Sequence, residues 1–200
     1  MSIIVEHEKR RREICEGALD VFVEEGFDNV TYQKIADRCG ITRTTLYLYF
    51  KNKREIFYFS IKQLLLNVES DITKFVHGDK QSYTEKLLNV MLSIIKHLEA
   101  NKRLLAVVIN YLNAIYNPDD RVRRRTIRLR HILSKLIIDG TKAGEFPKTL
   151  NVRDANELLY SLLESVVFRL VVLNRENADP LKGAVALAVH SLPGHKNEKA

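Results

Sequence analysis

Apolar residues recur at three- and four-residue intervals along nearly the whole chain, the spacing that places them on one face of an α-helix. In residues 6–25, for example, Ile14, Ala18, Val21 and Phe22 share one such face. Alternation of apolar and polar residues, which would predict a half-buried strand, never extends beyond a few positions. The pattern therefore predicts an all-α protein of about nine helices.

The shortest predicted helices lie between residues 31 and 55. Thr31 is a good N-cap residue for a short amphipathic helix that ends before Gly40. Thr42 is placed to cap the next helix, in which Leu46 and Phe50 lie four residues apart and would pack on the two preceding helices. Two such helices joined by a tight turn form a helix-turn-helix, which presents its second helix to the major groove of DNA.

Longer helices are predicted downstream, over about 53–76, 82–98, 102–115, 118–143, 151–171 and 181–192, and Asn52 with Glu55 three residues later is typical of the cap of the first. We therefore divide the chain into three parts. Residues 1–52 form a three-helix helix-turn-helix domain, residues 53–192 form a larger helical domain, and residues 193–200 form a short polar tail that is expected to be disordered.

In the helix that begins at Asn151, apolar residues come in adjacent pairs four residues apart, such as Leu158 with Leu159 and Leu162 with Leu163. This stripe is too wide for one partner, which indicates that one side packs on its own domain and the other on a second subunit. The alanine-rich last helix would permit close helix approach. We assign a dimer interface to these two helices, at Leu159, Leu163, Val166, Leu170, Ala184 and Ala188.

The net charge of +7 and a sequence pI near 9.4 favour a polyanionic partner. The excess is local, because residues 29–54 hold six lysines and arginines against the single acid Asp37. A second basic run, Arg121 to Arg130, lies on a helix with its own apolar stripe. For this run a solvated helix face is favoured, and a second nucleic-acid surface is the alternative.

Cys15 and Cys39 occupy helix-periodic apolar positions and are interpreted as structural thiols in a reducing compartment, with a redox switch as the alternative. The N-terminus lacks the apolar core of a signal peptide. The apolar run 161–173 is broken by Glu164 and Arg169 and is too short to cross a membrane. A soluble, cytoplasmic protein is expected.

Motifs for chemistry are missing from the sequence. It contains no Gly-rich phosphate loop, no His, Cys and Glu set at metal-binding spacing, and no nucleophile motif. We therefore expect neither enzyme activity nor a metal or cofactor.

The stretch from Arg11 to Ile56 closely resembles the DNA-binding domain of the tetracycline-repressor (TetR) family of transcriptional regulators. The resemblance covers many positions at fixed spacing: Gly26-Phe27, Ile35-Ala36, Leu-Tyr-x-Tyr-Phe at 46–50 and Lys-x-Lys-x-x-Ile at 51–56. The C-terminal region resembles the family in being all-helical, in its length, and in the helix end at Gly140 and Gly144-Glu145-Phe146.

The second helix of the helix-turn-helix is the recognition helix, and its first residues are predicted to contact bases: Arg43, Thr44 and Thr45. Arginine can bond guanine in a bidentate fashion, and threonine can contact a base or a thymine methyl. On the family pattern, Gln33 is a further base-contact candidate, and a solvated glutamine is the alternative. Phosphate contacts are predicted for Thr31, Thr42, Tyr47, Tyr49 and Lys53. Thr31 and Thr42 also fit as helix caps, and Tyr49 as a core residue.

The resemblance implies a homodimer, joined through the last two long helices, that binds a (pseudo)palindromic double-stranded operator. It also implies release from the operator when a small molecule binds the C-terminal core, with the helix that begins near Asn52 as the link. Such a regulator is usually a repressor. A helical DNA-binding dimer without a small ligand, such as a nucleoid or division factor, is the alternative.

Polar residues within apolar helical stretches are the candidates for effector contacts, and the abundance of apolar residues favours a hydrophobic effector. They are His97, Asn110, Tyr111, Asn113, His131, Tyr160 and Glu164.

Overall fold

The computed structural model describes residues 3–78, 81–114 and 120–193, and within these ranges the chain is helical with no strand. The helices are α1 (Ile3–Glu25), α2 (Tyr32–Arg38), α3 (Arg43–Tyr49), α4 (Lys53–Val76), α5 (Tyr83–Ala100), α6 (Lys102–Ala114), α7 (Asp120–Lys142), α8 (Val152–Val167) with a π-helical turn (Phe168–Val172), and α9 (Asp179–Ser191). The predicted all-α fold is confirmed. No helix among the described residues is long and apolar enough to cross a membrane.

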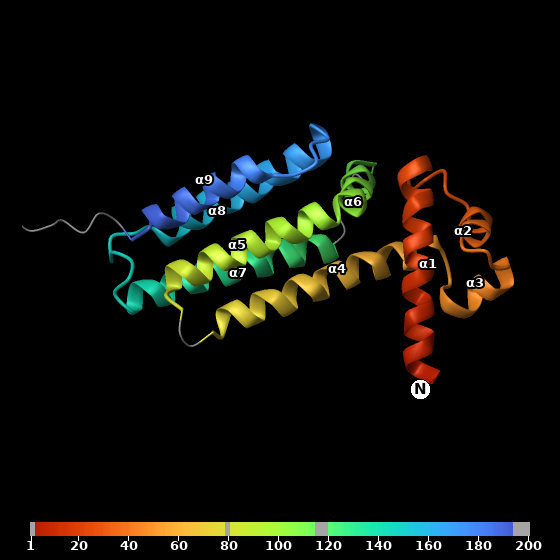
Figure 1. Cartoon of the computed structure of the whole chain (residues 1–200), viewed down its shortest axis with the longest axis horizontal. Coiled ribbons are helices and arrows are strands. Elements are labelled where there is room, and N and C mark those ends of the chain that lie inside the picture. The colour runs from red at the N-terminus through yellow and green to blue at the C-terminus, as the bar shows by residue number, and fades with distance from the viewer. Residues whose placement is uncertain (1–2, 79–80, 115–119, 194–200) are drawn as a thin grey trace, which may run out of the picture. The chain divides into compact units, whose positions relative to one another are not determined.

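The chain forms two compact units. Unit 1 comprises residues 1–67 and 101–117, so it holds α1, α2, α3, the first part of α4, and α6. Its core includes Ile14, Ala18, Val21 and Phe22, which helical periodicity placed on one face, and Figure 1 shows α2 and α3 together beside α1. Leu46 and Phe50 are both buried in this core, as the spacing predicted.

The first part of α4 and all of α6 lie in unit 1, whereas the sequence placed both with the C-terminal domain. The reason is packing: Leu104, Val107 and Tyr111 of α6 join the same buried cluster as α1 and the start of α4. Tyr111 stacks edge-on against Phe27 and Phe57, at centroid distances of 4.5 and 4.9 Å. The sequence predicted a helix here but did not indicate which helices it packs on, and it assigned Tyr111 to an effector contact rather than to this core.

Unit 2 comprises residues 68–100 and 118–200, of which the structure describes α5, α7, α8, α9 and the end of α4. Here α5 packs on α7 and α9, and α8 packs on α7 and α9, as Figure 1 shows. Glu145, in the loop after α7, accepts hydrogen bonds from the backbone amides of Tyr83 (2.9 Å) and Thr84 (3.1 Å). Glu145, about 60 positions away in the sequence, thus supplies acceptors for amides in the first turn of α5, which have no partner within the helix.

Four of the residues assigned to a dimer interface are not available to a second subunit. Leu159, Leu163, Val166 and Leu170 are between 0 and 4% exposed within the chain itself. The exposed apolar residues of these helices are instead Leu158, Phe168 and Val172 on α8 and its π-helical turn, and Leu187 on α9. The prediction therefore placed the outer face on residues that pack inside the chain, whereas Ala184 and Ala188 are half-buried.

Candidate nucleic-acid interface

Local hydrogen bonds define the turn between α2 and α3. The Thr31 hydroxyl accepts from the Lys34 amide (3.3 Å), and the Thr42 hydroxyl accepts from the Thr45 amide (3.0 Å), so both threonines cap their helices as predicted. Gly40 between the helices has a φ of 64°, in the left-handed region that glycine adopts without steric cost. These contacts fix the helix-turn-helix geometry.

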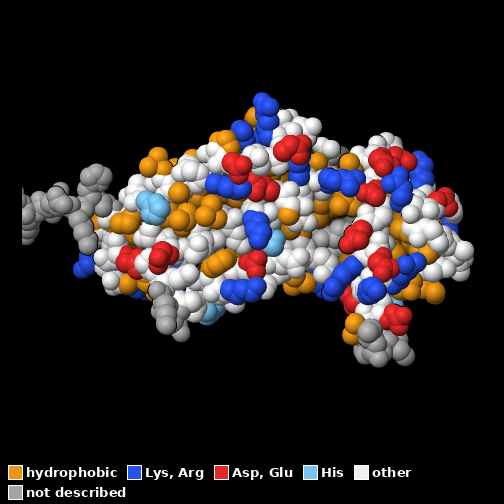
Figure 2. Space-filling model, in the orientation of Figure 1, with side chains coloured by type: hydrophobic (Ala, Val, Ile, Leu, Met, Phe, Trp, Pro, Cys, Tyr) orange, Lys and Arg blue, Asp and Glu red, His pale blue; other side chains and the backbone are white. Residues whose placement is uncertain are grey.

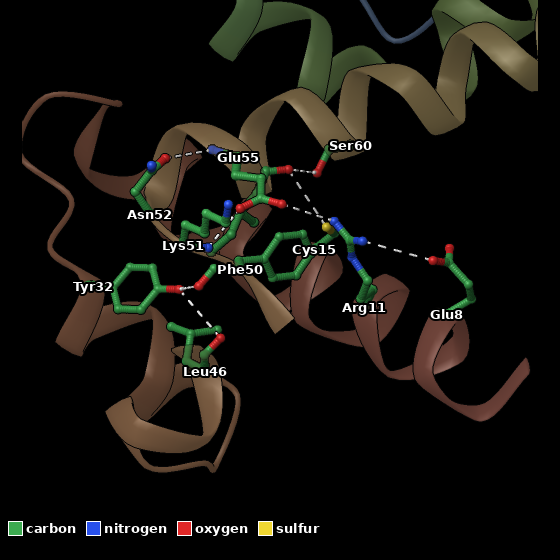
Figure 3. A network of polar contacts seen from close by, with 11 residues as sticks. Glu8, Arg11, Cys15, Tyr32, Leu46, Phe50, Lys51, Asn52, Glu55 and Ser60 are labelled. Carbon is green, nitrogen blue, oxygen red and sulfur yellow. Dashed lines mark hydrogen bonds and ion pairs between the residues drawn. The ribbon is translucent and has the colours of Figure 1, made fainter. Parts of the chain in front are cut away.

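Tyr32 of α2 holds the far end of α3 in place. Its single hydroxyl proton is shared between the backbone carbonyls of Leu46 (3.4 Å) and Phe50 (Figure 3). Burial, with a smaller contribution from nearby Tyr47, raises the pKa of Tyr32 to about 12, so the phenol keeps its proton well above neutral pH. The recognition helix is thus anchored at its first residue by Thr42 and at its last turn by Tyr32.

The start of α3 exposes the predicted base-reading residues. Arg43 and Thr44 are exposed, whereas the Thr45 hydroxyl lies 2.8 Å from that of Thr42 and is half-buried. A guanidinium nitrogen of Arg43 donates to the Tyr47 hydroxyl (3.1 Å), and Tyr47 in turn stacks on Tyr32 at 4.6 Å. This chain of contacts holds the Arg43 side chain over the outer face of α3.

Gln33 is exposed at the start of α2 and donates to Asp37 (2.7 Å), four residues along the same helix. The contact leaves the side chain on the surface beside the helix-turn-helix. Tyr49 is half-buried, and its ring lies 4.9 Å from that of His7 on α1. Of the tyrosines predicted to contact phosphates, Tyr47 is therefore the more accessible.

Lys53 occupies a different position from the one that its predicted phosphate contact requires. Its ammonium donates to the backbone carbonyls of Phe27 (2.8 Å), Asp28 (2.9 Å) and Val30 (2.8 Å), which uses all three of its donors. It also lies 4.9 Å from the centre of the Phe27 ring. In this structure Lys53 ties the loop after α1 to the start of α4, which argues against the phosphate contact predicted from the sequence.

A second tether, which sequence analysis missed, joins α1 to the start of α4 (Figure 3). The Glu55 carboxylate accepts from the Lys51 amide (2.7 Å) and from the Arg11 guanidinium (3.4 Å). That guanidinium lies over the rings of both Phe50 and Phe59, 4.5 and 4.4 Å from their centroids. Asn52 caps α4 by accepting from the Glu55 amide (2.9 Å), as predicted. Arg11 and Glu55 are 44 residues apart, so no local sequence pattern could reveal the pair.

The local basic excess is partly neutralised within unit 1. Lys34 pairs with Glu25 (2.5 Å), and Arg38 pairs with Glu24 (2.5 Å), both across α1 and α2. Figure 2 accordingly shows acidic and basic side chains interspersed over unit 1. Arg43 on the recognition helix and the nearby exposed Lys51 and Arg54 remain as the cations for a polyanionic partner.

The residues predicted to contact an effector are divided between the two units. Tyr111 belongs to the core of unit 1, Asn110 is exposed, and the side chain of Asn113 lies outside the described residues. In unit 2, His131 and Glu164 are exposed. The two remaining residues make specific contacts: His97 Nε2 lies 2.9 Å from a carboxylate oxygen of Asp71, and Tyr160 lies under the Arg130 guanidinium at 3.9 Å.

Arg128 and Arg130, in the basic run of α7, pair with Glu69 (2.9 Å) and Glu157 (2.5 Å), which favours the solvated-face interpretation for these two. The side chains of Arg121 to Arg125 lie outside the described residues.

Cys15 is buried, and desolvation raises its thiol pKa to about 12, while half-buried Cys39 also has a raised pKa for the same reason. High thiol pKa values do not suit a redox switch.

A capped helix-turn-helix with an arginine exposed at the start of its second helix, joined to a larger helical unit, defines a DNA-binding transcriptional regulator. Residues 14–58 match the family described as "Bacterial regulatory proteins, tetR family", and residues 62–184 match "YsiA-like protein, C-terminal region". The chain belongs to the TetR family of transcriptional regulators.

Relatives and solved structures support the same assignment. The "Fatty acid metabolism regulator protein" of Bacillus subtilis is 30% identical over 163 residues, which cover 78% of this chain and 80% of that protein. The fold is similar to that of a TetR transcription regulator from Haloarcula marismortui (TM-score 0.77, 18% identity, 92% of this chain and 98% of that chain). It is also similar to the fatty acid degradation regulator FadR from Bacillus halodurans (TM-score 0.69, 23% identity, 94% and 96%).

Proposed function

We propose that this regulator binds a (pseudo)palindromic operator as a homodimer, with α3 of each subunit in the major groove, and acts as a repressor released by a small apolar ligand. The observation that carries the proposal is the start of α3. Arg43 projects from a helix that Thr42 and Tyr32 fix at both ends, and Tyr47 orients its guanidinium. A preorganised arginine suits bidentate recognition of guanine.

The exposed surface of α8 and α9 supports the homodimer. Leu158, Phe168 and Val172 lie at spacings that place them on one outer stripe of α8 and its π-helical turn, and Leu187 on α9 is 74% exposed. Exposed large apolar residues on the outer sides of two packed helices are typical of a subunit interface. Two-fold symmetry at this face would match the symmetry of a palindromic operator.

A charged residue introduced on the exposed face of α9 tests whether this face forms the dimer interface. Leu187→Glu should shift the protein from dimer to monomer in analytical ultracentrifugation, because each subunit would bury an unpaired carboxylate. Leu66→Glu, at an exposed leucine of α4, is the control and should leave the mass unchanged. A Leu187→Glu protein that stays dimeric would refute this interface.

The relatives' names suggest the regulated genes. Two of the similar proteins are described as regulators of fatty acid metabolism or degradation, and we infer a role in the same area of metabolism for this chain. An effector derived from a fatty acid would carry a long apolar chain, in agreement with the hydrophobic effector predicted from composition. If no lipid-derived compound changes operator binding, the inducer part of the proposal is wrong and DNA binding stands alone.

Selection of genomic DNA fragments by the purified protein, followed by footprinting, tests operator binding directly. The wild type should protect two half-sites with centres about 34 to 36 Å apart or a multiple of that spacing. Arg43→Ala should lower operator affinity by about 1 to 3 kcal/mol and relax the preference at one base pair of each half-site. Equal loss on operator and on random DNA would show that Arg43 does not read a base.

A further inference from the structure

Leu48 on α3 has no role in the DNA contacts described above. It is 72% exposed, more than any other large apolar side chain described in unit 1. A single exposed leucine on a protein surface needs no explanation, so its place on the helix must decide what it does.

Helical geometry places Leu48 on the outermost line of α3. Each residue turns the helix by about 100°, so Leu48 lies about 200° around from Leu46, and Thr44 lies the same angle the other way. Leu46 is completely buried, and the two residues therefore point most directly away from the core. Thr44 and Leu48 are four positions apart and lie one above the other on this outer face.

The adjacent face of α3, about 100° around the helix, carries the oriented arginine. Arg43 and Tyr47 are also four positions apart and are joined by the 3.1 Å hydrogen bond. When Arg43 reaches the base edges of the major groove, Leu48 faces the same groove one turn further along the helix.

We propose that Leu48 is a specificity-determining residue that packs against the C5-methyl group of a thymine in each half-site; the inference rests on the proposed operator binding. Leucine has no donor or acceptor, and the thymine methyl is the apolar group that a base pair presents in the major groove. At any other base pair, Leu48 would cover a polar base edge and leave it without a hydrogen-bond partner, which is unfavourable.

Selection from random DNA provides the first test. The wild type should yield a symmetric motif with a thymine at one position of each half-site that is distinct from the guanine read by Arg43. Leu48→Ala should yield the same motif with that single position relaxed, while Leu66→Ala, at another exposed leucine of unit 1, should change nothing. Both residues are exposed, so thermal unfolding and binding to random DNA at low salt should match the wild type in both variants.

Removal of the methyl group alone provides the second test. Deoxyuridine in place of the thymine keeps the base pair and lacks only the methyl, so wild-type affinity should fall about fourfold per half-site, which is ~0.8 kcal/mol. Leu48→Ala should bind the two DNAs equally. A motif unchanged by Leu48→Ala, or a wild type indifferent to deoxyuridine, would overturn the role of Leu48 and leave operator binding intact. Failure of the wild type to select any motif would overturn the proposed function itself.

Discussion

Lys53 gives the sharpest test of how the DNA-binding unit is held together, because sequence and structure assign it different roles. As a phosphate ligand it would contribute to DNA affinity and little to folding. As the donor to the carbonyls of Phe27, Asp28 and Val30 it would contribute chiefly to the stability of unit 1. Lys53→Met separates the two roles, since methionine keeps much of the apolar stem and removes the ammonium.

The expected loss of stability follows from the three carbonyls. Those of Phe27 and Val30 are part-buried, whereas that of Asp28 is exposed and can bond to water. A buried acceptor left without its partner costs about 1 to 3 kcal/mol. Allowing some rehydration, Lys53→Met should lower the free energy of unfolding by about 2 to 4 kcal/mol. For a chain of 200 residues this corresponds to a fall in Tm of roughly 4 to 16 °C.

The assay is thermal unfolding at fixed protein concentration, combined with DNA affinity as a function of salt. Lys62→Met, at an exposed lysine on the same helix, is the matched control and should leave Tm unchanged. Each lost phosphate contact would reduce the slope of log K against log salt by about 0.9. A Lys53→Met protein with wild-type Tm and a reduced salt slope would refute the tether and restore the phosphate contact.

Two further predictions concern buried groups. Burial and a thiol pKa raised to about 12 should protect Cys15 from iodoacetamide at pH 8 in the folded protein. Cys39, whose thiol pKa is also raised, is only half-buried and should react first. Mass spectrometry with and without urea measures this, and labelling of Cys15 before unfolding would contradict it. Gly140→Ala should destabilise unit 2 by about 1 to 3 kcal/mol, because a Cβ there would lie 2.3 Å from the buried Phe146 ring. Gly78→Ala, where the nearest atom would lie at an ordinary 3.5 Å, should lower the free energy of unfolding by less. Urea unfolding of both variants measures this, and equal losses would count against the steric explanation.

The parts of the DNA-binding unit that sequence predicted well depend on contacts between near neighbours. The caps at Thr31, Thr42 and Asn52 each join residues three positions apart, and the sequence pattern at that spacing was sufficient to find them. The contacts that it missed join distant residues. Lys53 reaches a loop 23 to 26 positions away, and Arg11 reaches Glu55 across 44 positions.

The error in α8 has a different physical cause. Leu158 and Leu159 are equally apolar and differ by about 100° around the helix, so periodicity alone gives both columns the same weight. Packing against α7 and α9 decides which column is buried, and that packing depends on helices far away in the sequence. The paired pattern correctly indicated a helix with two apolar faces, and only tertiary contacts identify the outer one.

If a ligand releases the operator as proposed, the place of α6 in unit 1 offers a second route to α3. Sequence assigned the link to α4 alone, yet α6 packs in the same core as α1 and α4 through Tyr111, which contacts Phe27 and Phe57. Phe27 also supplies a carbonyl to Lys53 at the start of α4. A displacement of α6 would therefore act on the loop after α1 and on the start of α4 together. A ligand that moved α4 and α6 together would therefore act on α3 through both helices.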